Sequence, residues 1–215
     1  MKTDTAHHHW NRAWADIAQD SKWLTPEDDV MAWAATLDPG ARILDLGAGV
    51  GRHALWLARA GFAVTAVDAA PEGLAVIAAA GGVETCLAEM TALPFEDHSF
   101  DHVLSWNVIY HGDEEVVQNA IAEIRRVLRP GGSYLGTMLS KRRLSHDLAR
   151  GTGREISRNT WVFEDDGDSD KSHPHYYCTA AELLALFPGF EVQWLEDRAH
   201  EKPGSYHWHL IMERL

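Results

Sequence analysis

The sequence has few cysteines, few basic residues and no long apolar run. Its two cysteines, Cys86 and Cys178, lie far apart, which excludes a disulfide framework and is typical of a reducing compartment. The sequence has 19 lysines and arginines but 32 acidic residues, and the resulting net charge of -13 disfavours a nucleic-acid partner. No apolar stretch approaches the ~20 residues that span a bilayer, and the N-terminal segment does not resemble a signal peptide. We therefore expect a cytoplasmic protein that binds neither nucleic acid nor membrane.

The chain is long enough for one domain with a substantial core, since it has 215 residues and a hydrophobic content of 46%. We expect a single domain over residues 1–215, present as a monomer or a homodimer. Two residue types are unusually abundant, with 9 tryptophans and 13 histidines. Both types recur among the candidate site residues.

The stretch 41–52 is the centre of the prediction. A short apolar run that ends at Leu46 indicates a buried strand, and glycines at positions 47, 49 and 51 indicate a tight turn after it. Apolar residues then recur at helical spacing over 54–58. A strand, a glycine turn and a helix bring backbone N–H groups and a helix N-terminus against a ligand. Asp45 adds a carboxylate near the end of the strand.

The glycine turn is consistent with three kinds of ligand site. A phosphate loop requires Gly-Lys-Ser/Thr at its end, but Gly51 is followed by Arg52 and His53. The dinucleotide fingerprint requires glycine where Arg52 stands, and the Asp45 carboxylate would lie close to a pyrophosphate. A cofactor with a cationic end suits this carboxylate. Residues 45–51, D-L-G-A-G-V-G, resemble the first motif of the class I S-adenosylmethionine-dependent methyltransferases, an acid followed by G-x-G-x-G.

Two further features resemble the nucleoside-binding part of that family. Residues 62–68 indicate a second buried strand that ends in Asp68, where a carboxylate is placed to accept the ribose hydroxyls of an adenosine. A third strand over 84–88 is followed by Glu89 and then by L-P-F at 93–95. This order is similar to the family's adenine-binding turn, although the family usually has Asp where this chain has Glu89.

The resemblance continues towards the middle of the chain. A D-x-S-F-D turn at 97–101 precedes a fourth strand at 103–106, and L-R-P-G-G at 128–132 precedes a fifth strand at 133–139. The matching features together span residues 41–139.

The resemblance implies S-adenosylmethionine as the cofactor and S-adenosylhomocysteine as its product. The W-x-x-x-W spacing of Trp10 and Trp14 is weakly similar to the thiopurine and tellurite-resistance methyltransferases, whose aromatic residues close over the cofactor. Packing of an N-terminal helix on the core explains these tryptophans equally well. The positions implied for cofactor binding are Trp10, Trp14, Asp45, Gly47, Ala48, Gly49, Gly51, Arg52, Asp68, Ala69, Glu89, Met90, Leu93, Ser105 and Trp106.

Methyl transfer from a sulfonium depends mainly on positioning, which can be worth ~7–11 kcal/mol. If the acceptor must lose a proton, we expect His111 to take it, with Tyr110 as its catalytic neighbour at the carboxyl end of the fourth strand. A structural hydrogen bond or a cofactor contact explains His111 equally well. The residues expected to contact the substrate are Trp23, Asn107, His173, His175 and Tyr176.

The histidines also raise the hypothesis of a metal site. His207 and His209 would face the same way on a strand, and further histidines stand at 7–9 and at positions 173 and 175. No spacing of Cys and His matches a known zinc module, so we expect no metal.

The predicted fold class is α/β, a doubly wound, mostly parallel, seven-stranded Rossmann-like sheet with an antiparallel last strand. Residues 1–40 are expected to form N-terminal cap helices, and residues 41–139 the cofactor-binding core. The polar segment 140–178 is expected to be a lid-like loop insertion. Residues 179–215 would supply a closing helix and a hairpin.

The predicted function is S-adenosylmethionine-dependent methyl transfer by in-line displacement to a small molecule, which could be a thiol, an amine or an oxyanion. One alternative is a non-catalytic module that binds S-adenosylmethionine or a nucleoside. Another is a histidine-rich, metal-dependent methyltransferase.

Overall fold

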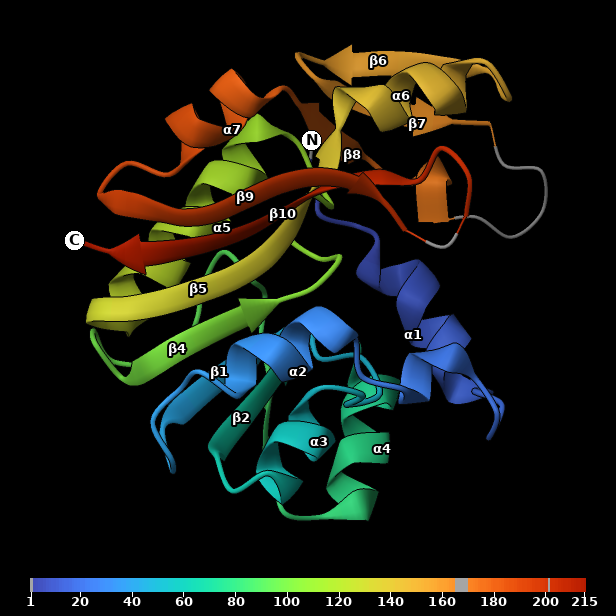
Figure 1. Ribbon diagram of the computed structural model, residues 1–215. Helices are drawn as coiled ribbons and strands as arrows, with labels where there is room; N and C mark the ends of the chain where they lie inside the picture. Colours follow the sequence, from blue (N-terminus) through green and yellow to red (C-terminus); the bar gives the residue numbers. More distant parts are fainter. Residues whose placement is uncertain (1, 165–169, 201) are drawn as a thin grey trace.

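The computed structural model describes residues 2–164, 170–200 and 202–215. Its centre is a parallel sheet in the order β3 (Glu84–Leu87), β2 (Ala63–Asp68), β1 (Arg42–Leu46), β4 (Phe100–Ser105) and β5 (Leu128–Ser140) (Figure 1). The strand β10 (Tyr206–Arg214) pairs antiparallel with β5, and β9 (Phe190–Ala199) pairs antiparallel with β10. These seven strands confirm the predicted sheet and its closing hairpin.

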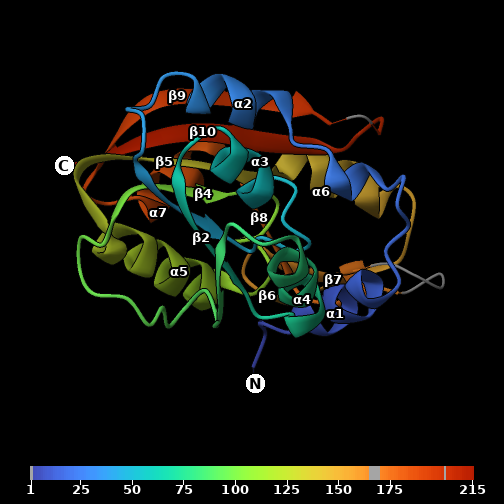
Figure 2. The same cartoon turned by 90° about the horizontal axis from the view of Figure 1, so that it is seen from below.

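Helices cover both faces of this sheet. The alternation of side chains along β1 places Ile43 with α2 (Asp28–Ala34), α3 (Ala54–Arg59) and α4 (Pro71–Ala80). It places Leu44 with α5 (Glu114–Val127) and α7 (Ala180–Leu186) on the other face. Figure 2 shows α2 and α5 on opposite sides of the strands. Because both faces of the central strands are buried, most of their residues are apolar rather than alternating with polar ones.

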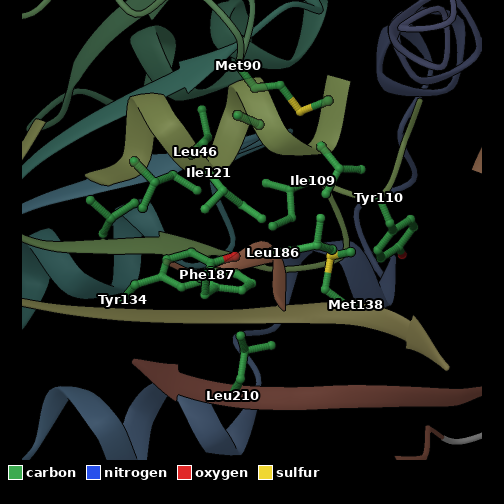
Figure 3. Packing of buried hydrophobic residues seen from close by; sticks show 14 of the residues in the cluster. Leu46, Met90, Ile109, Tyr110, Ile121, Tyr134, Met138, Leu186, Phe187 and Leu210 are labelled. Carbon is green, nitrogen blue, oxygen red and sulfur yellow. The ribbon is translucent and has the colours of Figure 1, made fainter. Parts of the chain in front are cut away.

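The larger core lies beneath α5, which begins at its N-cap Asp113. Ile121 of this helix packs towards Leu46 and Ile109, and Phe187 stacks on Tyr134 with 5.7 Å between ring centroids (Figure 3). Each such side chain stabilises the fold by roughly 1.5–3 kcal/mol through burial. This packing fixes the strand ends that carry the site.

The insertion after β5 is folded in the part that the structure describes, so the expectation of a loop over 140–178 is corrected, while its role as a lid stays a prediction. It contains α6 (Lys141–Leu148), β6 (Gly153–Ser157), β7 (Thr160–Phe163), the short helix η2 (Asp170–Ser172) and β8 (His175–Cys178). The strand β8 runs parallel to the end of β5 and antiparallel to β7. All four β8 residues are buried, and this burial orders a segment whose composition is mostly polar. Residues 165–169 of the insertion lie outside the described residues.

The N-terminal segment lies across the carboxyl ends of the strands. Its helix α1 (His7–Ala15) packs against α4, and the short helix η1 (Lys22–Leu24) follows. Within the described residues, every helix is too short or too polar to cross a bilayer. The division into cap, core, insertion and closing hairpin, the single-domain boundary and the oligomeric state stay predictions.

Candidate active site

A cavity of about 1020 Å³ opens at the carboxyl ends of the parallel strands. The turns after β1, β2 and β4 form its floor, while α1 and the segment from the end of β9 into β10 form its walls. The strand order reverses between β1 and β4, and open α/β sheets bind their ligands at such a switch point. The cavity is therefore the candidate active site.

The glycine turn after β1 adopts conformations that favour glycine. Gly47 has φ +74°, and its amide donates a 2.7 Å hydrogen bond to the Val67 carbonyl of the neighbouring strand. Gly49 has φ +54°, and a Cβ atom there would lie 3.1 Å from the ring of Trp14. Gly51 differs from both, because a Cβ atom there would meet the side chain of Ile77 rather than the cavity. The predicted turn is thus present, with its third glycine serving core packing.

A fourth glycine, Gly73 in α4, was not predicted as part of the site. A Cβ atom at Gly73 would lie 2.4 Å from the carbonyl oxygen of Gly49, so α4 can approach the turn only because residue 73 has no side chain. No local motif marks this glycine, since its partner lies in a different element.

Asp68 ends β2 and lines the cavity, as predicted from the sequence. Its carboxylate accepts hydrogen bonds from the amides of Gly49 at 2.7 Å and Ala70 at 2.8 Å. Burial raises the pKa of Asp68, and the backbone hydrogen bonds counteract that rise. Asp68 therefore holds the glycine turn in place while it faces the cavity.

Asp45 occupies a different place from the one that the motif suggests. Its side chain is buried on the face of β1 that packs on α3, and it does not line the cavity. Burial raises the pKa of Asp45 to about 7, while the Arg52 charge and a hydrogen bond from the Ala54 amide lower it. Within the described part of the chain, its Oδ2 atom has no hydrogen-bond partner. Asp45 therefore caps the start of α3 rather than contacting the cavity.

Three tryptophans cover the glycine turn. Trp10 stacks on Trp14 at 5.0 Å between ring centroids, and both meet Trp23 edge-on. Arg52 lies 5.0 Å from the Trp23 ring and donates a 2.7 Å hydrogen bond to Glu27. All five side chains line the cavity, so α1 and η1 form an aromatic roof with one buried cation beneath it.

Glu89 lies beside the cavity but does not line it. It accepts a 2.7 Å hydrogen bond from Lys2 and shares a hydrogen bond with Asp4. Burial and this hydrogen bond raise the pKa of Asp4 to about 7. Asp4 itself lines the cavity. Beside this turn it is thus Asp4, rather than Glu89, that faces the cavity, and the adenine contact of Glu89 stays a prediction.

A histidine-rich wall faces the aromatic roof. His207 and His209 project from the same face of β10, as predicted, and line the cavity with His200. The Nε2 atoms of His200 and His209 lie 3.0 Å apart, and Nδ1 of His209 lies 3.0 Å from Asp29. Burial lowers the pKa of His200 to about 3 and that of His209 to about 4. Both imidazoles are therefore neutral at pH 7. Because Nδ1 of His209 donates to Asp29, its Nε2 accepts the proton on Nε2 of His200, and the lone pair that this pair can offer to a ligand is on Nδ1 of His200.

His111 lies where the turn after β4 meets the insertion. Its Nε2 atom is 3.4 Å from Oδ2 of Asp170, and Nε2 of His175 is also 3.4 Å from that oxygen. An isolated bridge pairs the backbones of His111 and His175. Burial lowers the pKa of His111. Asp170 was not predicted as a site residue, because only the folded insertion brings it to the turn after β4.

The predicted site residues separate into two groups. Those that line the cavity are Trp10, Trp14, Trp23, Gly47, Ala48, Gly49, Arg52, Asp68, Ala69, Met90, Trp106, Asn107, Tyr110 and His111. Those that do not line it are Asp45, Gly51, Glu89, Leu93, Ser105, His173, His175 and Tyr176. Leu93, Ser105 and Tyr176 are buried in the interior, and His173 makes a 2.9 Å hydrogen bond with Thr5. The cavity-lining residues that sequence reasoning missed include Asp4, Asp170 and His200.

Comparisons with known proteins agree with this architecture. The family model described as "Methyltransferase domain" matches residues 43–132. An uncharacterized methyltransferase of Mycobacterium tuberculosis (strain ATCC 25618 / H37Rv) is 38% identical over 154 residues, which are 71% of this chain and 57% of that protein. The chain thus spans little more than half the length of this relative.

Solved structures share the fold. An S-adenosylmethionine-dependent methyltransferase from Methanosarcina mazei has a TM-score of 0.72 at 21% identity, covering 89% of this chain and 99% of its own. A Burkholderia thailandensis 1,6-didemethyltoxoflavin-N1-methyltransferase, solved with 1,6-didemethyltoxoflavin and S-adenosylhomocysteine, has a TM-score of 0.70 at 20% identity. That likeness covers 97% of this chain and 86% of the other.

Proposed function

The chain carries a methyltransferase domain of the class I, S-adenosylmethionine-dependent family, and we propose that it transfers a methyl group from S-adenosylmethionine to a small molecule. One observation carries this proposal. A single cavity joins the glycine turn and Asp68 to a wall of aromatic and neutral histidine side chains. The first part suits the cofactor, and the second suits an acceptor.

The residues around the glycine turn fit this cofactor. The Asp68 carboxylate retains lone pairs beyond the two amide hydrogen bonds that it accepts, so it can receive the ribose hydroxyls. Trp10 and Met90 offer apolar surface to the adenine ring. Arg52 is a buried cation whose guanidinium suits the carboxylate of the cofactor's amino-acid end. The bound cofactor supplies a sulfonium-activated methyl group.

The far part of the cavity is suited to hold the acceptor. Trp106 lines it, and its buried indole Nε1 has no hydrogen-bond partner among the residues described. His200 can accept a hydrogen bond at Nδ1 from an O–H, N–H or S–H group, while His209 holds the His200 ring through its own contacts with Asp29 and His200. Tyr110 and His111 border the same space. These side chains would orient the nucleophilic atom towards the methyl group, and this positioning is the main catalytic requirement.

The cavity volume supports a small-molecule acceptor. At about 1020 Å³ it is at the upper end of the roughly 300–1,000 Å³ typical of sites for one drug-sized ligand, so it has room for the cofactor and a small second molecule. The B. thailandensis neighbour holds a small molecule together with S-adenosylhomocysteine. We propose a thiol, an amine or an oxyanion as the acceptor of this chain.

Calorimetric titration with S-adenosylmethionine, S-adenosylhomocysteine and NAD tests the cofactor. We expect micromolar binding of the first two and none of NAD. A second assay would follow radioactive methyl transfer from S-adenosylmethionine to panels of small thiols, amines and oxyanions. Binding without transfer to any acceptor would favour the non-catalytic module instead. If neither S-adenosyl compound bound, the proposed function would be wrong.

A further inference from the structure

We propose that His111, Asp170 and His175 form a binding site for a divalent transition-metal cation such as Zn²⁺. The proposal concerns metal binding and does not rest on methyl transfer. The residues come from three separate elements, the turn after β4, the short helix η2 and the strand β8. Their donor atoms all lie within 4.8 Å of one another.

The spacing of the donors suits a tetrahedral cation. Oδ2 of Asp170 lies 3.4 Å from Nε2 of His111 and 3.4 Å from Nε2 of His175. Ligands at about 2.0–2.1 Å from a tetrahedral zinc ion are about 3.3–3.4 Å apart. Nε2 of His111 is buried and makes no other hydrogen bond among the residues described. The three donor atoms thus lie close enough together for one cation to contact all of them.

Hydrogen bonds on the far side of each ring fix which nitrogen is free. Nδ1 of His175 lies 2.8 Å from the His173 carbonyl oxygen, so it must donate its proton there. The His111 ring is hydrogen-bonded to the backbone of Val108. Metal-ligating histidines commonly donate their second N–H to a carbonyl in this way. Both rings therefore turn their Nε2 atoms, the nitrogens available to a metal ion, towards the Asp170 carboxylate.

This arrangement is electrostatically unfavourable without a cation. Two imidazole lone pairs and a carboxylate oxygen are all hydrogen-bond acceptors, and His111 and His175 are 7% and 2% exposed, so water screens them poorly. A proton could bridge only one pair of these atoms. A divalent cation would satisfy all three donors at once.

The backbone holds the donors in this geometry before any cation binds. An isolated bridge pairs His111 with His175, and the Tyr176 amide donates a 2.9 Å hydrogen bond to the Tyr110 carbonyl. Such preorganisation limits the entropy that is lost on binding.

The chemistry of the donors selects the class of cation. Two imidazole nitrogens with one carboxylate suit zinc, cobalt, iron or nickel, whereas magnesium and calcium prefer oxygen ligands. His111 and Asp170 line the cavity and His175 lies behind them. A fourth coordination position would therefore open towards the cavity, as in metal sites that keep a place for an exogenous ligand. In this assignment His111 is a ligand, in place of the proton-accepting role expected from the sequence.

The test uses the full chain, stripped of metal with a chelator and titrated with Co²⁺. We expect one equivalent to bind and to produce the visible d–d absorption of a low-symmetry site, and we expect its binding to raise the thermal unfolding temperature. The Asp170→Asn and His175→Ala variants should weaken Co²⁺ binding about 100-fold or more, because each loses a direct ligand and even second-shell changes cost 10–100-fold. Circular dichroism of the metal-free variants would confirm that both fold.

Matched controls separate this site from the other histidines. His173→Ala leaves the carbonyl that supports His175 intact, so it should bind Co²⁺ as the wild type does. Glu89→Gln removes a ligand from a second candidate group, Asp4, His7 and Glu89, and a double His8→Ala, His9→Ala variant removes two histidines from the N-terminal helix. Neither should change the stoichiometric binding.

Three outcomes would overturn the proposal. The wild type could bind no Co²⁺ in competition with a weak chelator. Binding could be unchanged in both Asp170→Asn and His175→Ala. It could also disappear in one of the control variants, or in His209→Ala, and that result would assign the cation to a different cluster.

Discussion

The carboxylate of Asp68 accepts a 2.7 Å hydrogen bond from the backbone amide of Gly49. This contact joins the end of β2 to the middle of the glycine turn after β1. Asp68, which we propose to hold the ribose, therefore also supports the glycine turn. We propose that this turn contributes the neighbouring part of the cofactor site. A change at Asp68 should therefore affect both stability and binding.

We expect Asp68→Ala to lower the affinity for S-adenosylmethionine and S-adenosylhomocysteine at least about tenfold and to cost about 1–3 kcal/mol of stability, because two buried amides lose their acceptor. Calorimetry and urea unfolding measure the two effects. Asp101→Ala is the matched control, since Asp101 accepts the Arg42 amide at the opposite end of the sheet. It should lower stability while leaving cofactor affinity unchanged. Unaltered affinity in Asp68→Ala would reject the ribose contact.

Gly73→Ala should destabilise the protein, although alanine is normally favoured over glycine in a helix by about 1 kcal/mol. The added methyl group would lie 2.4 Å from the Gly49 carbonyl oxygen and would push α4 away from the turn. We expect a loss of about 1–3 kcal/mol in urea unfolding, together with weaker cofactor binding. Ala75→Gly, at an exposed position of the same helix, measures how much the different helix propensities of alanine and glycine change the stability. A stabilised Gly73→Ala protein would contradict the close approach of α4.

Trp10→Ala should weaken cofactor binding about three- to tenfold, which corresponds to the loss of one aromatic stacking contact of roughly 0.5–1.5 kcal/mol. Intrinsic fluorescence offers a direct measurement, because Trp10, Trp14 and Trp23 cluster at the cavity. We expect the cofactor to change the emission of the wild type and to change that of Trp10→Phe less. Trp56→Phe is the control, since Trp56 packs with the core on the α3 face. An equal response in all three proteins would argue against the aromatic roof.

The histidine-rich wall predicts how stability depends on pH. The folded-state pKa of His200 is about 3, below the ~6.5 of an unfolded histidine, because burial disfavours its charged form. The unfolded chain therefore binds more protons than the folded one between these values. The contribution of His200 to the free energy of unfolding should therefore be greatest above about pH 6.5, and it should decline as the pH falls. Between pH 7 and pH 5 the loss due to His200 would be up to about 2 kcal/mol.

Urea unfolding of the wild type and of His200→Gln at pH 7.5, 6 and 5 measures this loss. Carboxyl groups such as Asp4 titrate in both proteins, so their contribution cancels in the difference. We expect the wild type to lose more stability on acidification than His200→Gln does, and His8→Gln, at an exposed position, to follow the wild type. Parallel curves for the wild type and His200→Gln would contradict the buried neutral state of His200.

The parts of the site that could be predicted are those encoded by neighbouring residues. Gly47 and Gly49 stand beside the strand that they end, and Asp68 stands at the end of its own strand, so a local pattern was enough to find them. Asp45 does not line the cavity, and its predicted part in cofactor binding stays untested. The motif places an acid near the turn, but the alternation of side chains along β1 turns that acid towards α3.

The sequence by itself determined the seven-stranded core and the edge at which the cavity opens, because strand burial, glycine turns and helix caps depend on residues close together in the chain. Only the tertiary structure decided what faces that edge. The fold of the insertion brings Asp170 to His111 and His175, the β9–β10 hairpin brings His200 to His209, and α4 brings Gly73 to the carbonyl of Gly49. These contacts join residues from separate elements, and their free energy exists only after the elements have packed.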